Sequence, residues 1–157
     1  MTTTTQHKNF QLLAGFFNQS LSATQNSVNT FLSIQTEANY DLMKAALNQK
    51  QTDIYTTNNQ FRILVSASDG TVVYDGSKID SNSTTSNNTF DNFTNKRINE
   101  NHNTRPEIMV ATLNSSGTGL SSRYSSSVSR NLLYNAYRLG SSVNENVGTY
   151  RCSITSA

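Results

Sequence analysis

The first third of the chain carries a helical pattern that is too long for a domain of this size. Apolar or small residues recur every three or four positions from Phe10 to Ala45, and neither proline nor glycine occurs from Phe16 to Thr57. This spacing predicts a helix with one apolar face. From Phe10 to Tyr55 such a helix is about 70 Å long. Part of it must therefore extend beyond the core or pair with another chain.

The apolar face can be covered in two ways, which the sequence leaves open. It packs on a sheet of the same chain, or it pairs with a second copy, and we expect a homodimer through this N-terminal helix. Thr24 and Gln35 are polar interruptions of the face. The chain then divides into a long helix that acts as stalk and dimer contact, residues 1–57, and a second unit, residues 58–157. The face consists of Phe10, Ala14, Phe17, Leu21, Val28, Phe31, Ala38, Leu42 and Ala45.

After Asn58 the pattern changes from helix to strand. Residues 61–66 are β-branched and apolar, and residues 72–75 form a second short run of the same kind. Asp69-Gly70 lies between the two runs and supplies the left-handed backbone that a hairpin turn needs. The segment 76–95 is rich in Ser, Thr and Asn and predicts a long loop with one short helical turn near residues 90–93.

A second helix is predicted where Thr104 precedes Pro106 and Glu107. Thr104 is placed to cap it, Pro106 suits its first turn, and Glu107 stands where a capping box needs an acidic residue. The helix continues through Leu113 and ends at the glycine of Ser115-Ser116-Gly117. Three strand-like runs complete the chain, and they cover residues 119–128, 131–139 and 147–155.

Composition narrows the function classes. The chain has 157 residues, enough for one core, and about 40% of them are Asn, Ser or Thr, which indicates an uncharged polar surface. The net charge of +2 and the absence of a basic run argue against nucleic acid. No apolar run approaches the roughly 20 residues that cross a bilayer, so we expect membrane attachment only through segments absent from this chain.

The sequence offers no complete catalytic set, metal site or cofactor motif. Its two histidines lie far apart, and Cys152 is its single cysteine, placed among strand-like residues where a small buried side chain is expected. There is no glycine-rich phosphate loop and no serine in a nucleophile elbow. We therefore predict that the chain is not an enzyme, with no catalytic residues, no metal and no cofactor.

Several short motifs follow one another in a distinctive order. The order of a long helix, a hairpin, a loop with a short helix and a three-strand meander is that of a PAS-like α+β domain. With these motifs, residues 65–151 resemble Cache-type sensor domains of bacterial receptors, in particular phosphate-regulon-type sensor histidine kinases, and also chemoreceptors. The matching residues are Asp69, Gly70, Val72, Asp75, Asn101, His102, Arg105, Pro106, Glu107, Gly117, Gly119, Arg123, Tyr124, Ser125, Leu133, Tyr134 and Ala136.

The resemblance implies a five-stranded antiparallel sheet with a short helix and a long loop on one face, and a small ligand held between them. The ligand-binding residues that it implies are His102, Arg105, Arg123, Tyr124, Ser125 and Tyr134. Arginine, tyrosine and serine donors suit a small anion. A second interpretation stays open, in which Arg105 and Arg123 pair with Glu107 or Asp75 and hold the fold together without a ligand, and His102 anchors a loop.

Two functions from different classes remain. The first is an extracytoplasmic ligand-binding sensor module of a signal-transduction receptor, periplasmic or on the cell surface, which transmits through its long helix. The second is a structural or assembly protein, such as a virion or surface component, that reuses the same fold with a filled cavity. The chain's uncharged polar surface suits the second function as well as the first. A roomy pocket beside Arg123 and Tyr124 would favour sensing, and side chains filling that space would favour assembly.

Overall fold

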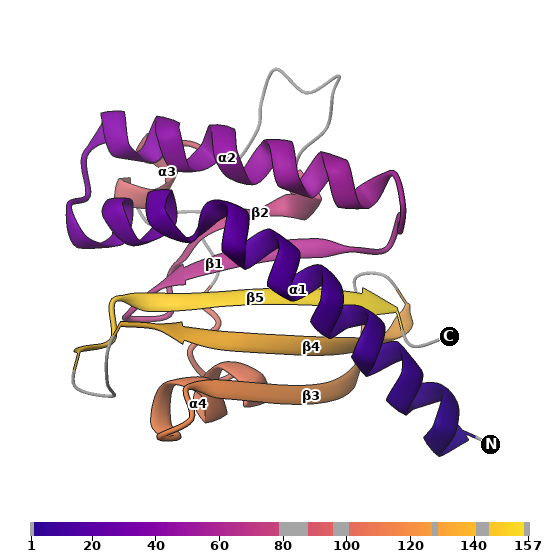
Figure 1. The fold of residues 1–157 in the computed structure, drawn as a ribbon. Helices are drawn as coiled ribbons and strands as arrows, with labels where there is room; N and C mark the ends of the chain where they lie inside the picture. Colours follow the sequence, from indigo (N-terminus) through magenta and orange to yellow (C-terminus); the bar gives the residue numbers. More distant parts are fainter. Residues whose placement is uncertain (1, 79–87, 96–100, 127–128, 141–144, 156–157) are drawn as a thin grey trace.

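A five-stranded antiparallel sheet organises the protein (Figure 1). The computed structural model describes residues 2–78, 88–95, 101–126, 129–140 and 145–155. The strands lie in the order β2-β1-β5-β4-β3, so the last strand of the chain occupies the centre of the sheet. The α+β class, with N-terminal helix before a five-stranded sheet, is confirmed. The strands are β1 (Arg62–Ala67), β2 (Val72–Asp75), β3 (Thr118–Ser125), β4 (Arg130–Leu139) and β5 (Gly148–Thr155).

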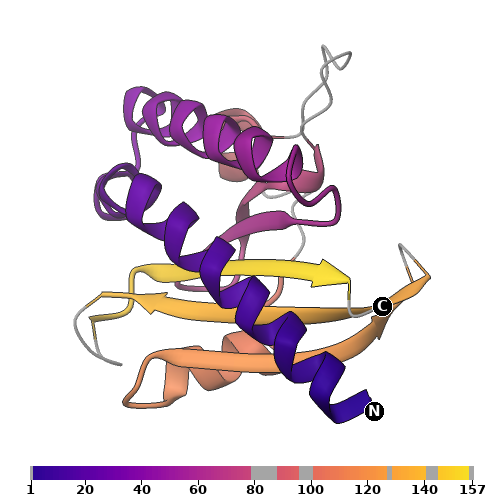
Figure 2. The same ribbon diagram turned by 45° about the vertical axis from the view of Figure 1, so that its right-hand side comes forward.

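The predicted continuous helix is in fact two helices, α1 (Thr2–Ser33) and α2 (Glu37–Tyr55). The helix is interrupted at Thr36. Its side chain accepts a hydrogen bond from the Asn39 backbone N–H at 3.2 Å and so caps the start of α2. The Asn39 side chain also donates to the Ile34 carbonyl at 2.9 Å, which satisfies the end of α1. The chain therefore turns back at residues 34–36, and α2 runs beside the second half of α1 (Figures 1 and 2).

The apolar face of α1 packs on β4 and β5 of the same chain (Figure 1). Phe17 meets the Tyr150 ring edge to face at 5.8 Å, and the Thr24 hydroxyl lies 2.9 Å from the Tyr150 hydroxyl. Ser20 Oγ lies 3.5 Å from Cys152 Sγ. Cys152 is fully buried, as expected, and burial raises the pKa of its thiol to about 12. Thr24, which interrupts the apolar pattern, is therefore a contact with the sheet.

Phe31 at the end of α1 is the centre of an aromatic cluster that joins three helices. Its ring lies edge to face with Tyr40 of α2 at 5.2 Å and with Phe93 of α3 (Phe90–Asn95) at 5.7 Å. The Tyr40 hydroxyl donates to the Val73 carbonyl of β2 at 2.8 Å, which fixes the cluster to the sheet. The helical turn predicted near residues 90–93 is thus confirmed. The loop before it follows a 3-10 turn at Gly76–Lys78, and its residues 79–87 lie outside the described part.

The helix α4 (Pro106–Leu113) lies against the other face of the sheet, along β3 and β4 (Figure 2). Arg138 donates to the carbonyls of Ala111 at 3.3 Å and Asn114 at 2.7 Å, which fastens the end of the helix. A side chain at Gly119 would collide with the Glu107 carbonyl, so glycine allows the first turn to lie directly on β3. The helix starts where the sequence predicts it.

The predicted capping box at the start of α4 is wrong. Arg105, not Thr104, is the N-cap residue, and its side chain makes no capping hydrogen bond. The Glu107 side chain turns away from the helix end and is fully buried against the sheet. Two arginines of the sheet bind it there, and these contacts outweigh what a cap hydrogen bond offers.

Two carboxamide side chains take the place of missing strand neighbours at the β1–β2 edge. Gln51 donates to the Phe61 carbonyl and accepts from the Ile63 N–H, both at 2.8 Å. Asn88 bonds both the N–H and the carbonyl of Asp75 at 2.9 Å. The Gln51 contacts satisfy backbone groups of β1 beyond the end of β2, and the Asn88 contacts satisfy those of Asp75 on the edge strand β2.

We expect Gln51→Leu to lower the free energy of unfolding by about 1–3 kcal/mol, because it leaves the buried Ile63 N–H without a partner and removes one of the two donors to the Phe61 carbonyl, the other being Arg62. Gln19→Leu, at an exposed position of α1, is the matched control and should change it by less than about 0.5 kcal/mol. Urea unfolding followed by circular dichroism measures both. Equal effects of the two substitutions would contradict the role given to Gln51.

Candidate functional site

A pocket of about 570 Å³ lies on the sheet face opposite α1. Every residue that the sequence singled out for ligand binding lines it. Whether they contact a ligand stays a prediction, but the structure brings side chains from β3, β4 and the loop before α4 to one place. The six residues are His102, Arg105, Arg123, Tyr124, Ser125 and Tyr134.

The pocket also contains charged residues that the sequence analysis did not single out as ligand-binding: Arg62 of β1, Asp75 of β2 and Arg151 of β5. Four arginines therefore face a single aspartate among the lining residues. Arg151 lies between Tyr150 and Cys152, which face α1, so strand alternation places it on the pocket face. The sequence analysis expected Cys152 to be buried. The alternation of side chains along the strand would then have predicted that Arg151 points to the opposite face.

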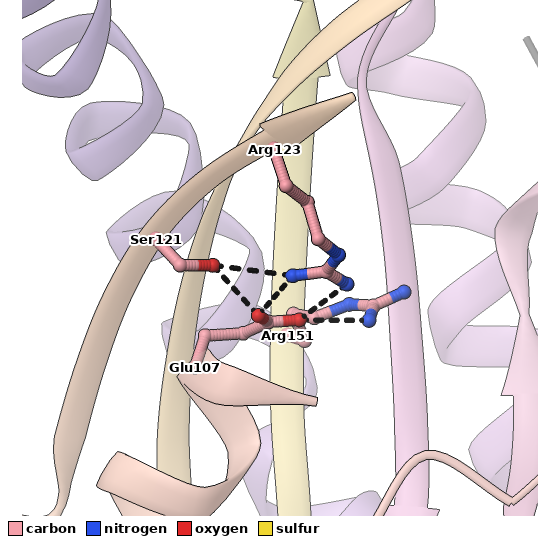
Figure 3. Close-up of polar contacts among 4 residues, drawn as sticks. All are labelled: Glu107, Ser121, Arg123 and Arg151. Carbon is pink, nitrogen blue, oxygen red and sulfur yellow. Dashed lines mark hydrogen bonds and ion pairs between the residues drawn. The ribbon is translucent and has the colours of Figure 1, made fainter. Parts of the chain in front are cut away.

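Glu107 binds two of the pocket's arginines, Arg123 and Arg151 (Figure 3). Both terminal nitrogens of Arg123 donate to the Glu107 carboxylate. Nη1 donates to Oε2, and Nη2 donates to Oε1 at 2.9 Å. Arg151 Nη1 donates to Oε1 at 3.0 Å, and the Ser121 hydroxyl donates to Oε2 at 2.7 Å. One carboxylate thus joins α4, β3 and β5. The pairing of Arg123 with Glu107 that the second interpretation expected is present.

Tyr134 of β4 supplies the aromatic surface of the pocket. The Arg123 guanidinium carbon lies 3.8 Å from the centre of the Tyr134 ring, and that of Arg151 lies 4.7 Å from it. Guanidinium groups stack favourably on aromatic rings at such distances. Tyr134 is 5% exposed, so the ring and the carboxylate together hold both guanidinium planes in place.

Tyr124 lies at the rim of the pocket. Consecutive residues of a strand point to opposite faces, so the side chains of Arg123 and Tyr124 leave β3 in opposite directions. Tyr124 is 62% exposed. Tyr134, rather than Tyr124, is therefore the phenol that accompanies the arginines inside the pocket.

The loop before α4 brings two further predicted residues to the pocket. His102 is buried, its backbone N–H donates to the Gly70 carbonyl at 2.9 Å, and its carbonyl accepts from the Arg105 N–H at 3.0 Å. His102 therefore ties the loop to the β1–β2 turn. Arg105 is exposed, and its side chain has no ion-pair partner among the described residues.

Electrostatics keep the buried carboxylate ionised. Burial alone raises the pKa of Glu107, but the hydrogen bond from Arg123 and the charge of Arg151 outweigh it and hold the pKa at about 2. Burial lowers the pKa of Arg151, while Glu107 acts in the opposite direction. The cluster of Glu107, Arg123 and Arg151 therefore keeps one net positive charge.

The described residues hold no group of three His, Cys, Asp or Glu side chains that could bind a metal ion. Within the same ranges, no helix combines the length and the apolar character needed to cross a bilayer.

Glu107→Gln should destabilise the fold in a pH-dependent way. The folded-state pKa of Glu107, about 2, lies below its ordinary value of 4.5, so its ionisation stabilises the fold fully above pH 4.5 and progressively less as the pH falls toward 2. We expect a loss of about 2–3 kcal/mol at pH 7 that shrinks as the pH approaches 2. Denaturant unfolding of both proteins across this range measures the difference. A difference that stays constant with pH would contradict this account of Glu107.

Comparisons with known proteins support the fold. No family model matches the chain, and no curated protein matches it significantly. Among solved structures, a domain assigned to the sensory box/GGDEF family from Vibrio parahaemolyticus matches with a TM-score of 0.50 at 12% identity. The match covers 98% of this chain and 61% of that chain. The match supports the PAS-like α+β fold for this chain.

Proposed function

We propose that this chain is the ligand-binding sensor module of a signal-transduction receptor, of the Cache type, and that it binds a small anion in the arginine-lined pocket. The observation that carries the proposal is the excess of arginine over carboxylate in a pocket of about 570 Å³. Guanidinium groups bind carboxylates and phosphates through paired hydrogen bonds. The pocket volume falls in the range of small-molecule sites, about 300–1,000 Å³.

The arrangement of the arginines supports binding by a preformed site. Glu107 and Tyr134 hold Arg123 and Arg151 in fixed positions. A ligand then loses less affinity to the ordering of side chains. Arg105, exposed at the mouth, adds a cation that Glu107 does not neutralise. We propose binding rather than catalysis because the arginine side chains of the pocket are hydrogen-bond donors, which suit an anion.

The central strand offers a route from the pocket to the long helix. Arg151 lines the pocket, and its neighbours Tyr150 and Cys152 contact Thr24 and Ser20 of α1 on the other face. A ligand that shifts Arg151 therefore acts on the strand against which α1 packs. In a receptor the module would lie outside the cytoplasm, with α1 carrying the signal toward segments beyond this chain.

The alternative function, an assembly protein that reuses the fold, expects side chains to fill the space beside Arg123. The pocket volume and its charged lining favour sensing over this alternative.

Calorimetric titration tests the proposal with panels of carboxylates, amino acids and inorganic phosphate. We expect at least one anion to bind, and Arg105→Ala to weaken it about tenfold, the effect of losing one charge-assisted hydrogen bond of roughly 1.4 kcal/mol. The melting temperature should stay unchanged, because the Arg105 side chain makes no capping hydrogen bond and has no ion-pair partner among the described residues, and alanine keeps the backbone contacts of this position. Lys8→Ala, an exposed cation on α1, is the control. No heat with any anion would contradict the proposal and favour the assembly protein.

A further inference from the structure

The two arginines that bind Glu107 keep hydrogen-bond donors that no described residue uses (Figure 3). An arginine side chain carries five N–H groups. Arg123 donates three of them, two from Nη1 to Glu107 and Ser121 and one from Nη2 to Glu107. Its Nε–H and its second Nη2–H remain, and they lie on one edge of the guanidinium plane. Arg151 donates only one, from Nη1 to Glu107.

The Tyr134 ring stands between these two guanidinium groups, and its hydroxyl is a third open donor. In the register of the sheet, Arg123 is opposite Leu132, two residues before Tyr134. Arg151 is opposite Ala136, two residues after it. The guanidinium groups therefore approach the ring from opposite directions and cover its faces. A ligand thus reaches Tyr134 at the hydroxyl, which has no hydrogen-bond partner among the described residues.

The charge around Tyr134 suits an anion with two negative charges. The pair of Arg123 and Arg151 keeps one positive charge after Glu107, and Arg105 in the lining adds a second. The lining carboxylate of Asp75 belongs to β2, three strands away from β4 in the sheet. At roughly 4.8 Å per strand this separation is about 14 Å. Asp75 therefore lies at the end of the pocket away from Tyr134.

We propose that Arg123, Tyr134 and Arg151 form a subsite for the phosphate group of a small phosphate monoester. Donors on three sides need three acceptor oxygens in different directions, which a tetrahedral phosphate group has and a planar carboxylate lacks. A phosphate monoester also carries about two negative charges at neutral pH. The proposal rests on the proposed function, since it names the ligand class of the same pocket.

The rest of the pocket suits the organic part of such a ligand. Its volume of about 570 Å³ exceeds what one phosphate group fills, and Leu64 and Leu132 belong to the lining. At the β2 end, Asp75 Oδ1 accepts hydrogen bonds from Ser77. Asp75 Oδ2 has no partner among the described residues. A hydroxyl or amino group of the ligand therefore has an acceptor there.

Calorimetric titration with methyl phosphate, methanesulfonate and succinate separates charge from shape. At about pH 8, above the second phosphate pKa of about 6, methyl phosphate is a tetrahedral dianion. Methanesulfonate has the same shape with one charge, and succinate has two charges on planar groups. We expect methyl phosphate to bind at least about tenfold more tightly than either, the effect of one charge-assisted hydrogen bond. Arg105→Ala should reduce the preference for methyl phosphate over methanesulfonate.

The outcomes distinguish the subsite from the proposed function. Methanesulfonate or succinate binding as tightly as methyl phosphate would overturn the subsite and leave anion binding intact, whereas no heat with any anion would contradict both. Glycerol 3-phosphate and inorganic phosphate separate the two sources of the phosphate group. Glycerol 3-phosphate should bind more tightly, because the lining beyond the subsite covers its organic part. The reverse order would assign the pocket to free phosphate and contradict the monoester.

Tyr134→Phe tests the hydroxyl, because phenylalanine keeps the ring between the guanidinium groups. We expect the dissociation constant of methyl phosphate to rise about five- to tenfold and the melting temperature, followed by circular dichroism, to stay unchanged. Tyr55→Phe is the matched control and should leave the affinity as it is. Tyr55 also stacks with an arginine, Arg62, but is not among the pocket-lining residues. An affinity indifferent to Tyr134→Phe would overturn the subsite.

Discussion

The buried carboxylate of Glu107 is the constraint on which this side of the protein depends. An ionised group without solvent contact needs charged partners and hydrogen bonds, since an unpaired buried charge costs several kcal/mol. Glu107 obtains them from Arg123, Arg151 and Ser121, which belong to the edge and the centre of the sheet. The first turn of α4 is therefore fixed to β3 and β5 by the same contacts that position the pocket's guanidinium groups. Structure and proposed binding share one set of interactions.

The length of the N-terminal helical pattern posed a problem that the fold solves by a turn. A helix of about 70 Å would extend far beyond a sheet of this size, and the reversal at residues 34–36 returns the chain over the sheet. Thr36 and Asn39 make this reversal without glycine or proline, through two side-chain hydrogen bonds. The apolar residues of α1 and the buried residues of α2 then surround one aromatic cluster at Phe31.

Patterns local in the sequence predicted the sheet well, because a strand shows its own alternation and a hairpin its own turn residues. The β1–β2 turn at Gly70, with φ of +88°, and the start of α4 at Pro106 are of this kind. The failures concern partners distant in sequence. Glu107 resembles a capping residue until Arg123 and Arg151, 16 and 44 residues away, compete for its carboxylate. The helix break was missed because its capping residues also occur within helices.

The six residues that line the pocket could be grouped from the sequence because the family resemblance implies a tertiary arrangement. Composition and spacing alone do not give one. Arg151 was not predicted as a pocket residue, because the sequence pattern of its strand is set by Tyr150 and Cys152 on the apolar face. Yet that strand joins the two halves of the molecule. Arg151 faces the pocket, whereas Tyr150 and Cys152 contact Thr24 and Ser20. Neighbouring side chains of β5 share one backbone. A displacement of β5 on the pocket side must therefore also alter its contacts with α1.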